Sequence, residues 1–127
     1  MWGRIKIDPL DVLVSKIVRR RANGRCQRCL KPKEFSELQA AHCWGRRKMS
    51  VRYDLDNLLA VCYYCHRQID GENPDAKKEL FVKYLGEDGY KKLNQRANWP
   101  QQYKPDKKAI EIYLKKILNE TNTTFTG

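Results

Sequence analysis

Long apolar runs are missing from this sequence. No stretch approaches the roughly 18 apolar residues that a membrane-spanning helix needs, and the N-terminal residues lack the apolar core of a secretion signal. We therefore expect neither a membrane protein nor a secreted one, and a reducing cytoplasm is the expected location. Internal repeats and low-complexity tracts are also missing, which excludes solenoid and fibrous architectures.

Acidic residues are few compared with basic ones. Twenty-six Lys and Arg stand against fifteen Asp and Glu, which gives a net charge of +11. A positive surface of this size concentrates polyanions, and the phosphate backbone of nucleic acid is the usual one. A membrane surface, ribosomal RNA and simple solubility remain alternative explanations of the charge. At 127 residues the chain is expected to form one domain with a thin core, which a bound metal ion often reinforces.

Helical patterns occupy both ends of the chain. Asp8 followed by Pro9 is a typical helix start, and the next apolar residues share one face, which predicts a helix over residues 8–23. Residues 75–120 are predicted to form further helices, with a break at Gly86. We expect these C-terminal helices to act as scaffolding.

Residues 25–70 have a different pattern. Two short apolar runs, around residues 38–42 and 57–61, are typical of strands, and the charged segment between them is expected to form a loop. A short helix is expected to follow and to stop at Gly71. The sequence therefore predicts a small α+β protein in which helices flank a pair of strands.

Cysteine is scarce but regularly spaced. Two Cys-x-x-Cys pairs bracket the central segment: Cys26 with Cys29, and Cys62 with Cys65. Disulfides are rare in a reducing cytoplasm, and four thiolates complete the tetrahedron that structural Zn²⁺ prefers. Four sulfur ligands leave no open position, so this ion is expected to hold structure and to do no chemistry. Four unrelated core cysteines and a redox pair are the alternatives, and the fifth cysteine, Cys43, is expected to be a small buried hydrophobe.

Histidine is scarcer still, and both copies lie within or directly beside the region that the cysteine pairs bracket. His42 ends the first predicted strand, Asn57 begins the second, and His66 directly follows the last cysteine. Asp70 lies one helical turn beyond His66 and shares its helix face. The arrangement resembles the HNH, or ββα-metal, endonuclease family, and the cysteine pairs are similar to those of zinc-bearing phage nucleases. Three segments carry the resemblance: Ala41–Arg46, Asp54–Leu58 and Cys62–His66.

The resemblance implies a ββα-metal HNH core with a structural zinc site of four cysteines, within a single domain of residues 1–127 that acts in a bacterial or phage-infected cell. His42 is expected to be the general base, since a neutral imidazole can take a proton from water near pH 7. Asn57 is expected to tie the hairpin together and to fix the His42 ring by hydrogen bonding. His66 and Asp70 are expected to bind a catalytic Mg²⁺ or Mn²⁺. Many family members carry a metal-binding Asp or His directly before the base, where this sequence has Ala41.

Basic residues crowd the loop between the predicted strands. They are Arg46, Arg47, Lys48 and Arg52. We expect them to contact DNA phosphates with weak sequence preference, because phosphate contacts do not read bases. The predicted function is therefore a metal-dependent DNA endonuclease, monomeric or homodimeric, that makes nicks or double-strand cuts. A non-catalytic zinc-containing DNA-binding module, which Ala41 favours, and a nuclease for branched DNA are the alternatives.

Overall fold

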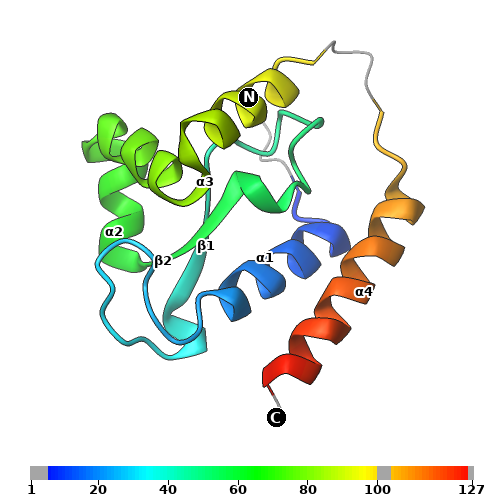
Figure 1. The fold of residues 1–127 in the computed structure, drawn as a ribbon, viewed down its shortest axis with the longest axis horizontal. Coiled ribbons are helices and arrows are strands. Elements are labelled where there is room, and N and C mark those ends of the chain that lie inside the picture. The colour runs from blue at the N-terminus through cyan, green and yellow to red at the C-terminus, as the bar shows by residue number, and fades with distance from the viewer. Residues whose placement is uncertain (1–5, 100–103, 126–127) are drawn as a thin grey trace.

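A strand hairpin at the centre of the molecule is surrounded by helices (Figure 1). The structure, a computed structural model, describes residues 6–99 and 104–125. Short 3-10 helices and one π-helical turn connect the main elements; they cover Phe35–Glu37, Leu55–Asn57 and Gln68–Glu72. The main elements in chain order are α1 (Pro9–Arg21), β1 (Leu38–His42), β2 (Leu58–Cys62), α2 (Tyr63–Arg67), α3 (Pro74–Ala97) and α4 (Lys107–Phe125). The predicted small α+β fold is confirmed.

The two strands form an antiparallel sheet. His42 is opposite Leu58 and Leu38 is opposite Cys62, so the end of β1 lies beside the start of β2. Every residue of β2 is buried, whereas β1 is only partly buried. Because α2 begins directly after Cys62, the order of elements is strand, strand, helix, which is the ββα arrangement.

Two aspartates set the start of α1. The Asp8 carboxylate accepts a hydrogen bond from the Asp11 amide at 3.0 Å, and the Asp11 carboxylate accepts one from the Asp8 amide at 2.9 Å, which forms a capping box. On the inner face, Val14 and Ile17 are buried in the core that α1 shares with the hairpin. The predicted N-terminal helix is confirmed, although it ends at Arg21.

The C-terminal helices also follow the expected pattern. Gly86 breaks α3, because its φ of 77° and ψ of 164° lie in a region that essentially only glycine adopts. α4 lies alongside α1 (Figure 1), and Leu114 of α4 is fully buried in the common core. Among the described residues, no helix combines the length and the apolar character that crossing a membrane requires.

Candidate functional site

Four cysteine side chains converge at one end of the hairpin. Cys26 and Cys29 come from the segment after α1, Cys62 ends β2, and Cys65 lies in α2. Their sulfur atoms all lie within 4.8 Å of one another, and the sulfurs of Cys29 and Cys62 are 4.0 Å apart. Tetrahedral Zn–S bonds of about 2.3 Å would place the sulfurs about 3.8 Å apart. The cluster therefore fits the zinc ion that the cysteine spacing predicts.

The backbone around the first cysteine pair favours a thiolate. Burial alone would raise the pKa of the Cys26 thiol, but hydrogen bonds from the amides of Cys29, Cys62 and Arg28 lower it to about 7. Leu30 follows the pair with a φ of 65°, and its amide donates to the Cys26 carbonyl at 2.9 Å. The segment thus turns tightly around a sulfur that ionises near neutral pH, as zinc binding requires.

Three of the residues singled out by sequence line one groove. His42 at the end of β1, His66 in α2 and Asp70 in the π-helical turn all border a groove of about 1370 Å³. Basic side chains from the N-terminal segment, α1, the β1–β2 loop and α3 line it as well; they are Lys6, Arg19, Arg46, Arg47, Lys48, Arg52 and Lys77. Asp11 is a second carboxylate on its wall. Two histidines and two carboxylates therefore share a groove whose lining is mostly positively charged.

Contacts on two sides hold the His66 ring. Its Nδ1 lies 2.7 Å from Gln39 Oε1 of β1, and its Nε2 lies 2.7 Å from one carboxylate oxygen of Asp70. The Gln39 oxygen accepts a hydrogen bond, so its contact requires a hydrogen on Nδ1, and the contact of Nε2 with the carboxylate requires a second hydrogen, on Nε2 or on the carboxylate. The other oxygen of Asp70 lies 2.8 Å from the ammonium nitrogen of Lys77, at the start of α3.

The surroundings of His42 favour its neutral form. Burial lowers the pKa of this half-buried ring below its ordinary value of 6.5, and the positive charge of Arg46 lowers it further. The carboxylates of Asp11 and Asp70 act in the opposite direction, and His66 adds a smaller lowering effect. The net direction is downward, so the ring is available to accept a proton at neutral pH.

Asn57 closes the loop that starts after His42. Its buried side-chain amide donates to the Trp44 carbonyl at 2.9 Å and accepts from the Trp44 amide at 2.8 Å. Its own carbonyl accepts a hydrogen bond from Cys43 at 2.8 Å. The expected tie across the hairpin is present, but the side chain holds the Trp44 backbone instead of bonding to the His42 ring.

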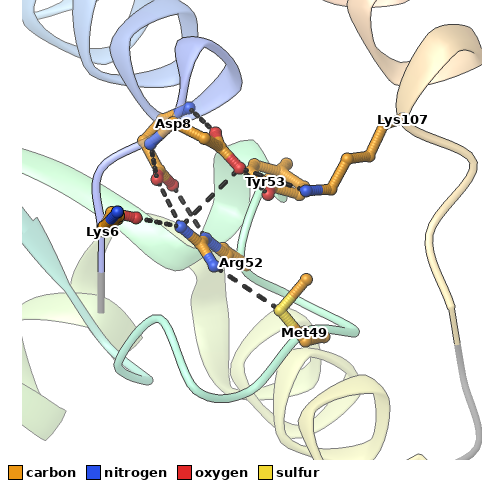
Figure 2. Close-up of polar contacts among 7 residues, drawn as sticks. Lys6, Asp8, Met49, Arg52, Tyr53 and Lys107 are labelled. Atoms are coloured by element: carbon orange, nitrogen blue, oxygen red, sulfur yellow. Dashed lines mark hydrogen bonds and ion pairs between the residues drawn. The ribbon is translucent and has the colours of Figure 1, made fainter. Parts of the chain in front are cut away.

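Arg52 has a different environment from the other basic residues of the loop. Its side chain is only 8% exposed, and its guanidinium pairs with the Asp11 carboxylate at 2.6 and 3.1 Å. It also donates to the Lys6 carbonyl at 2.9 Å, and the hydroxyl of Tyr53 donates to Asp8 beside it (Figure 2). Arg52 borders the groove, but its donors already hold the loop to the start of α1, which argues against the expectation that it contacts DNA.

Two residues that contact the site were not expected from the sequence. Gln39, which contacts the His66 ring, is the single polar residue before the histidine in an otherwise apolar strand, and that pattern is a usable signal for a polar contact. Lys77 lies in α3 and is one of many lysines, so no local pattern marks it. Its place beside Asp70 depends on how the π-helical turn leads into α3.

A hairpin joined to a short helix beside four clustered cysteines forms a ββα unit with a group of thiols that could hold a metal ion. Residues 26–71, a little over a third of the chain, match the model of the HNH endonuclease family. This match confirms the resemblance carried by the histidines and cysteines, and it indicates a nuclease-type function. Neither a curated protein nor a solved structure matches the chain.

Proposed function

We propose that this protein is a metal-dependent endonuclease that hydrolyses phosphodiester bonds in DNA, with the whole chain acting as one domain. The observation that carries the proposal is the convergence of His42, His66 and Asp70 on one groove lined with basic side chains. The groove offers a proton acceptor, metal ligands and phosphate-binding groups within one site.

His42 is proposed to be the general base. A neutral imidazole takes a proton from a water molecule, and the resulting oxygen attacks phosphorus while one P–O bond of the backbone breaks. The lowered pKa of His42 supports this role, since the ring remains unprotonated at neutral pH. Asn57 is proposed to position His42 indirectly, because it fixes the backbone of Trp44 two residues further on.

His66 and Asp70 are proposed to bind the catalytic divalent ion. An imidazole nitrogen and a carboxylate oxygen suit Mg²⁺ or Mn²⁺, although such a pair does not select sharply between them. The ion would supply positive charge to the phosphate and to the leaving oxygen. Gln39 supports this role, because its contact with Nδ1 directs Nε2 of His66 toward Asp70, where a metal ion would take the place of the hydrogen between them.

Arg46, Arg47 and Lys48 are proposed to contact the DNA backbone on the rim of the groove. Such contacts position a duplex without reading its sequence, so weak sequence preference is expected. Affinity should fall steeply as salt concentration rises, because bound counterions are released from the phosphates.

A non-catalytic DNA-binding module is the second candidate. It is favoured by Ala41, which is fully buried and offers no ligand atom at the position where many family members bind the metal. In that case the groove would bind DNA and leave it uncut.

A plasmid nicking assay with Mn²⁺ or Mg²⁺ separates the two candidates. We expect wild type to nick, and His42→Ala to lower the rate constant by about 10²- to 10⁴-fold because the general base is lost. His42→Ala should still bind DNA and zinc like wild type, which separates lost chemistry from lost folding. Added imidazole should restore part of its rate, because the small molecule can occupy the emptied space.

Two results would contradict the proposal. Equal nicking by wild type and His42→Ala would remove His42 as the base. DNA binding by wild type without any nicking, in both metals, would favour the non-catalytic module.

A further inference from the structure

Lys77 is a charged residue of the groove that the proposed mechanism has not used. It lies in the first turn of α3, outside residues 26–71 that match the HNH family, and its side chain is about a quarter exposed. Its ammonium nitrogen is 2.8 Å from one oxygen of Asp70, while the other oxygen faces His66 at 2.7 Å. Both oxygens of the proposed metal-binding carboxylate are therefore already in contact with a partner.

The charge of Lys77 also reaches the end of β1. Cys43 directly follows His42, and burial raises the pKa of its thiol while the nearby positive charge of Lys77 acts in the opposite direction. Lys77 and His42 border the same groove. Lys77 thus lines the groove that is proposed to bind the DNA backbone.

Among the described residues, two carboxylates line the groove, and one of them, Asp11, already pairs with Arg52 at 2.6 Å. Ala41 offers no ligand atom, so Asp70 is the carboxylate that can join His66 in binding a metal. Lys77 pairs with that same carboxylate. A divalent ion bound there would have to share or displace the contact with Lys77, and the two positive charges would repel one another. Once released from Asp70, the ammonium group needs another anion, and the DNA phosphate is the one that the groove is proposed to bind.

We infer that Lys77 supplies a positive charge at the proposed metal site. Its ammonium group pairs with Asp70 in the metal-free protein and contacts the DNA phosphate once a divalent ion binds to that carboxylate. This inference rests on the proposed function. It implies that Lys77 weakens metal binding in the absence of DNA and contributes to the rate of cleavage in its presence.

The expected weakening of metal binding by Lys77 is tested by measuring Mn²⁺ binding without DNA, by titration calorimetry on zinc-loaded protein. We expect Lys77→Met to bind Mn²⁺ at least about fivefold more tightly than wild type, because one neighbouring positive charge is removed. Lys77→Arg keeps the charge and should stay within about twofold of wild type. Lys78→Met is the matched control, since Lys78 is the exposed neighbour on the same helix and its loss changes net charge equally.

The expected contribution of Lys77 to the cleavage rate is tested by single-turnover cleavage at saturating Mn²⁺. Lys77→Met should be at least about tenfold slower than wild type, because a donor aimed at the phosphate is lost, while Lys78→Met should cut at the wild-type rate. Lys77→Gln provides a second neutral variant in case the methionine variant fails to fold. A structural role alone would not tighten Mn²⁺ binding while slowing cleavage.

The possible results distinguish this inference about Lys77 from the proposed endonuclease function on which it rests. If wild type binds Mn²⁺ and cuts DNA, unchanged Mn²⁺ affinity in both neutral variants would overturn the inference and leave the proposed function intact. Tighter Mn²⁺ binding with an unchanged cleavage rate would overturn the phosphate contact. A wild-type protein that neither binds Mn²⁺ nor cuts DNA would overturn the proposed function, and the inference with it.

Discussion

Arg52 should contribute to stability and not to DNA affinity. Its guanidinium and the Asp11 carboxylate form a two-point pair, with both side chains only 8% exposed, and the Lys6 carbonyl accepts a further hydrogen bond (Figure 2). The pair joins the β1–β2 loop to the start of α1. Replacing Arg52 with Met keeps much of the apolar stem but leaves a buried carboxylate without its cation.

The magnitude follows from this burial. Removing one partner of a buried pair costs about 3–5 kcal/mol. The Asp8 amide donates to Asp11 at 2.9 Å, and the substitution does not remove this donor. We therefore expect Arg52→Met to lower the free energy of unfolding by about 3 kcal/mol, at the lower end of this range. For a chain of this size that corresponds to a fall in Tm of about 12 °C.

Urea denaturation at a fixed zinc concentration measures this loss. The matched control is Arg47→Met, which removes the same charge from an exposed position in the same loop and should cost less than about 0.5 kcal/mol. A double-mutant cycle with Asp11→Asn should show that the double variant loses less than the sum of the single variants, by about 2 kcal/mol.

DNA binding should show the opposite pattern. Arg47→Met should weaken binding and reduce the salt dependence by about one phosphate contact, while folded Arg52→Met keeps the wild-type affinity. If Arg52→Met were as stable as Arg47→Met, or if the two substitutions with Asp11→Asn were additive, the assignment of Arg52 to a structural pair would be wrong.

Three further predictions address the backbone, the zinc site and the general base. Gly86→Ala should lower the free energy of unfolding in urea by about 1–3 kcal/mol, because alanine does not tolerate the positive φ at this position. Gly45→Ala should lower it far less, because Gly45 has open space around it and no positive φ. Equal losses in the two variants would contradict this account. Elemental analysis should find zinc bound to the protein, and a zinc-selective chelator should reduce its helical circular dichroism, whereas an unchanged spectrum would argue against a structural ion. The pKa of His42 is lowered by burial and by Arg46, so the cleavage rate should fall with decreasing pH along a curve whose midpoint lies below 6.5; a midpoint at or above pH 6.5 would contradict the assignment of His42 as the titrating base.

Much of the fold could be predicted because its signals are local. The helix start at Asp8 and Pro9, the break at Gly86 and the spacing within each Cys-x-x-Cys pair depend on residues close together in the chain. His42 and His66 could be recognised because their spacing is fixed by a hairpin and one helix. Patterns of this kind can be recognised in the sequence without knowledge of the tertiary structure.

The roles of Arg52 and Lys77 could not be predicted in this way. Arg52 lies in a run of basic loop residues, and only the approach of Asp11 from α1 shows that it is buried and paired. Lys77 reaches Asp70 because the π-helical turn and the start of α3 bring the two together. Sequence reveals the charge of each residue, but the partner of that charge comes from a distant or irregular segment.

The zinc cluster and the proposed catalytic site are mechanically linked through His66. Cys65 directly precedes His66 in α2, and Gln39 of β1 holds the His66 ring from the other side. Cys62, at the end of β2, belongs to the same cluster, so a bound zinc ion fixes α2 against the hairpin that carries His42. Loss of zinc would loosen the packing of α2 against β2, and the placement of the His66 ring would then depend on its contacts with Gln39 and Asp70. Because proton transfer and metal binding both depend on the placement of side chains within a fraction of an ångström, cleavage should be lost on zinc removal before the rest of the fold unravels.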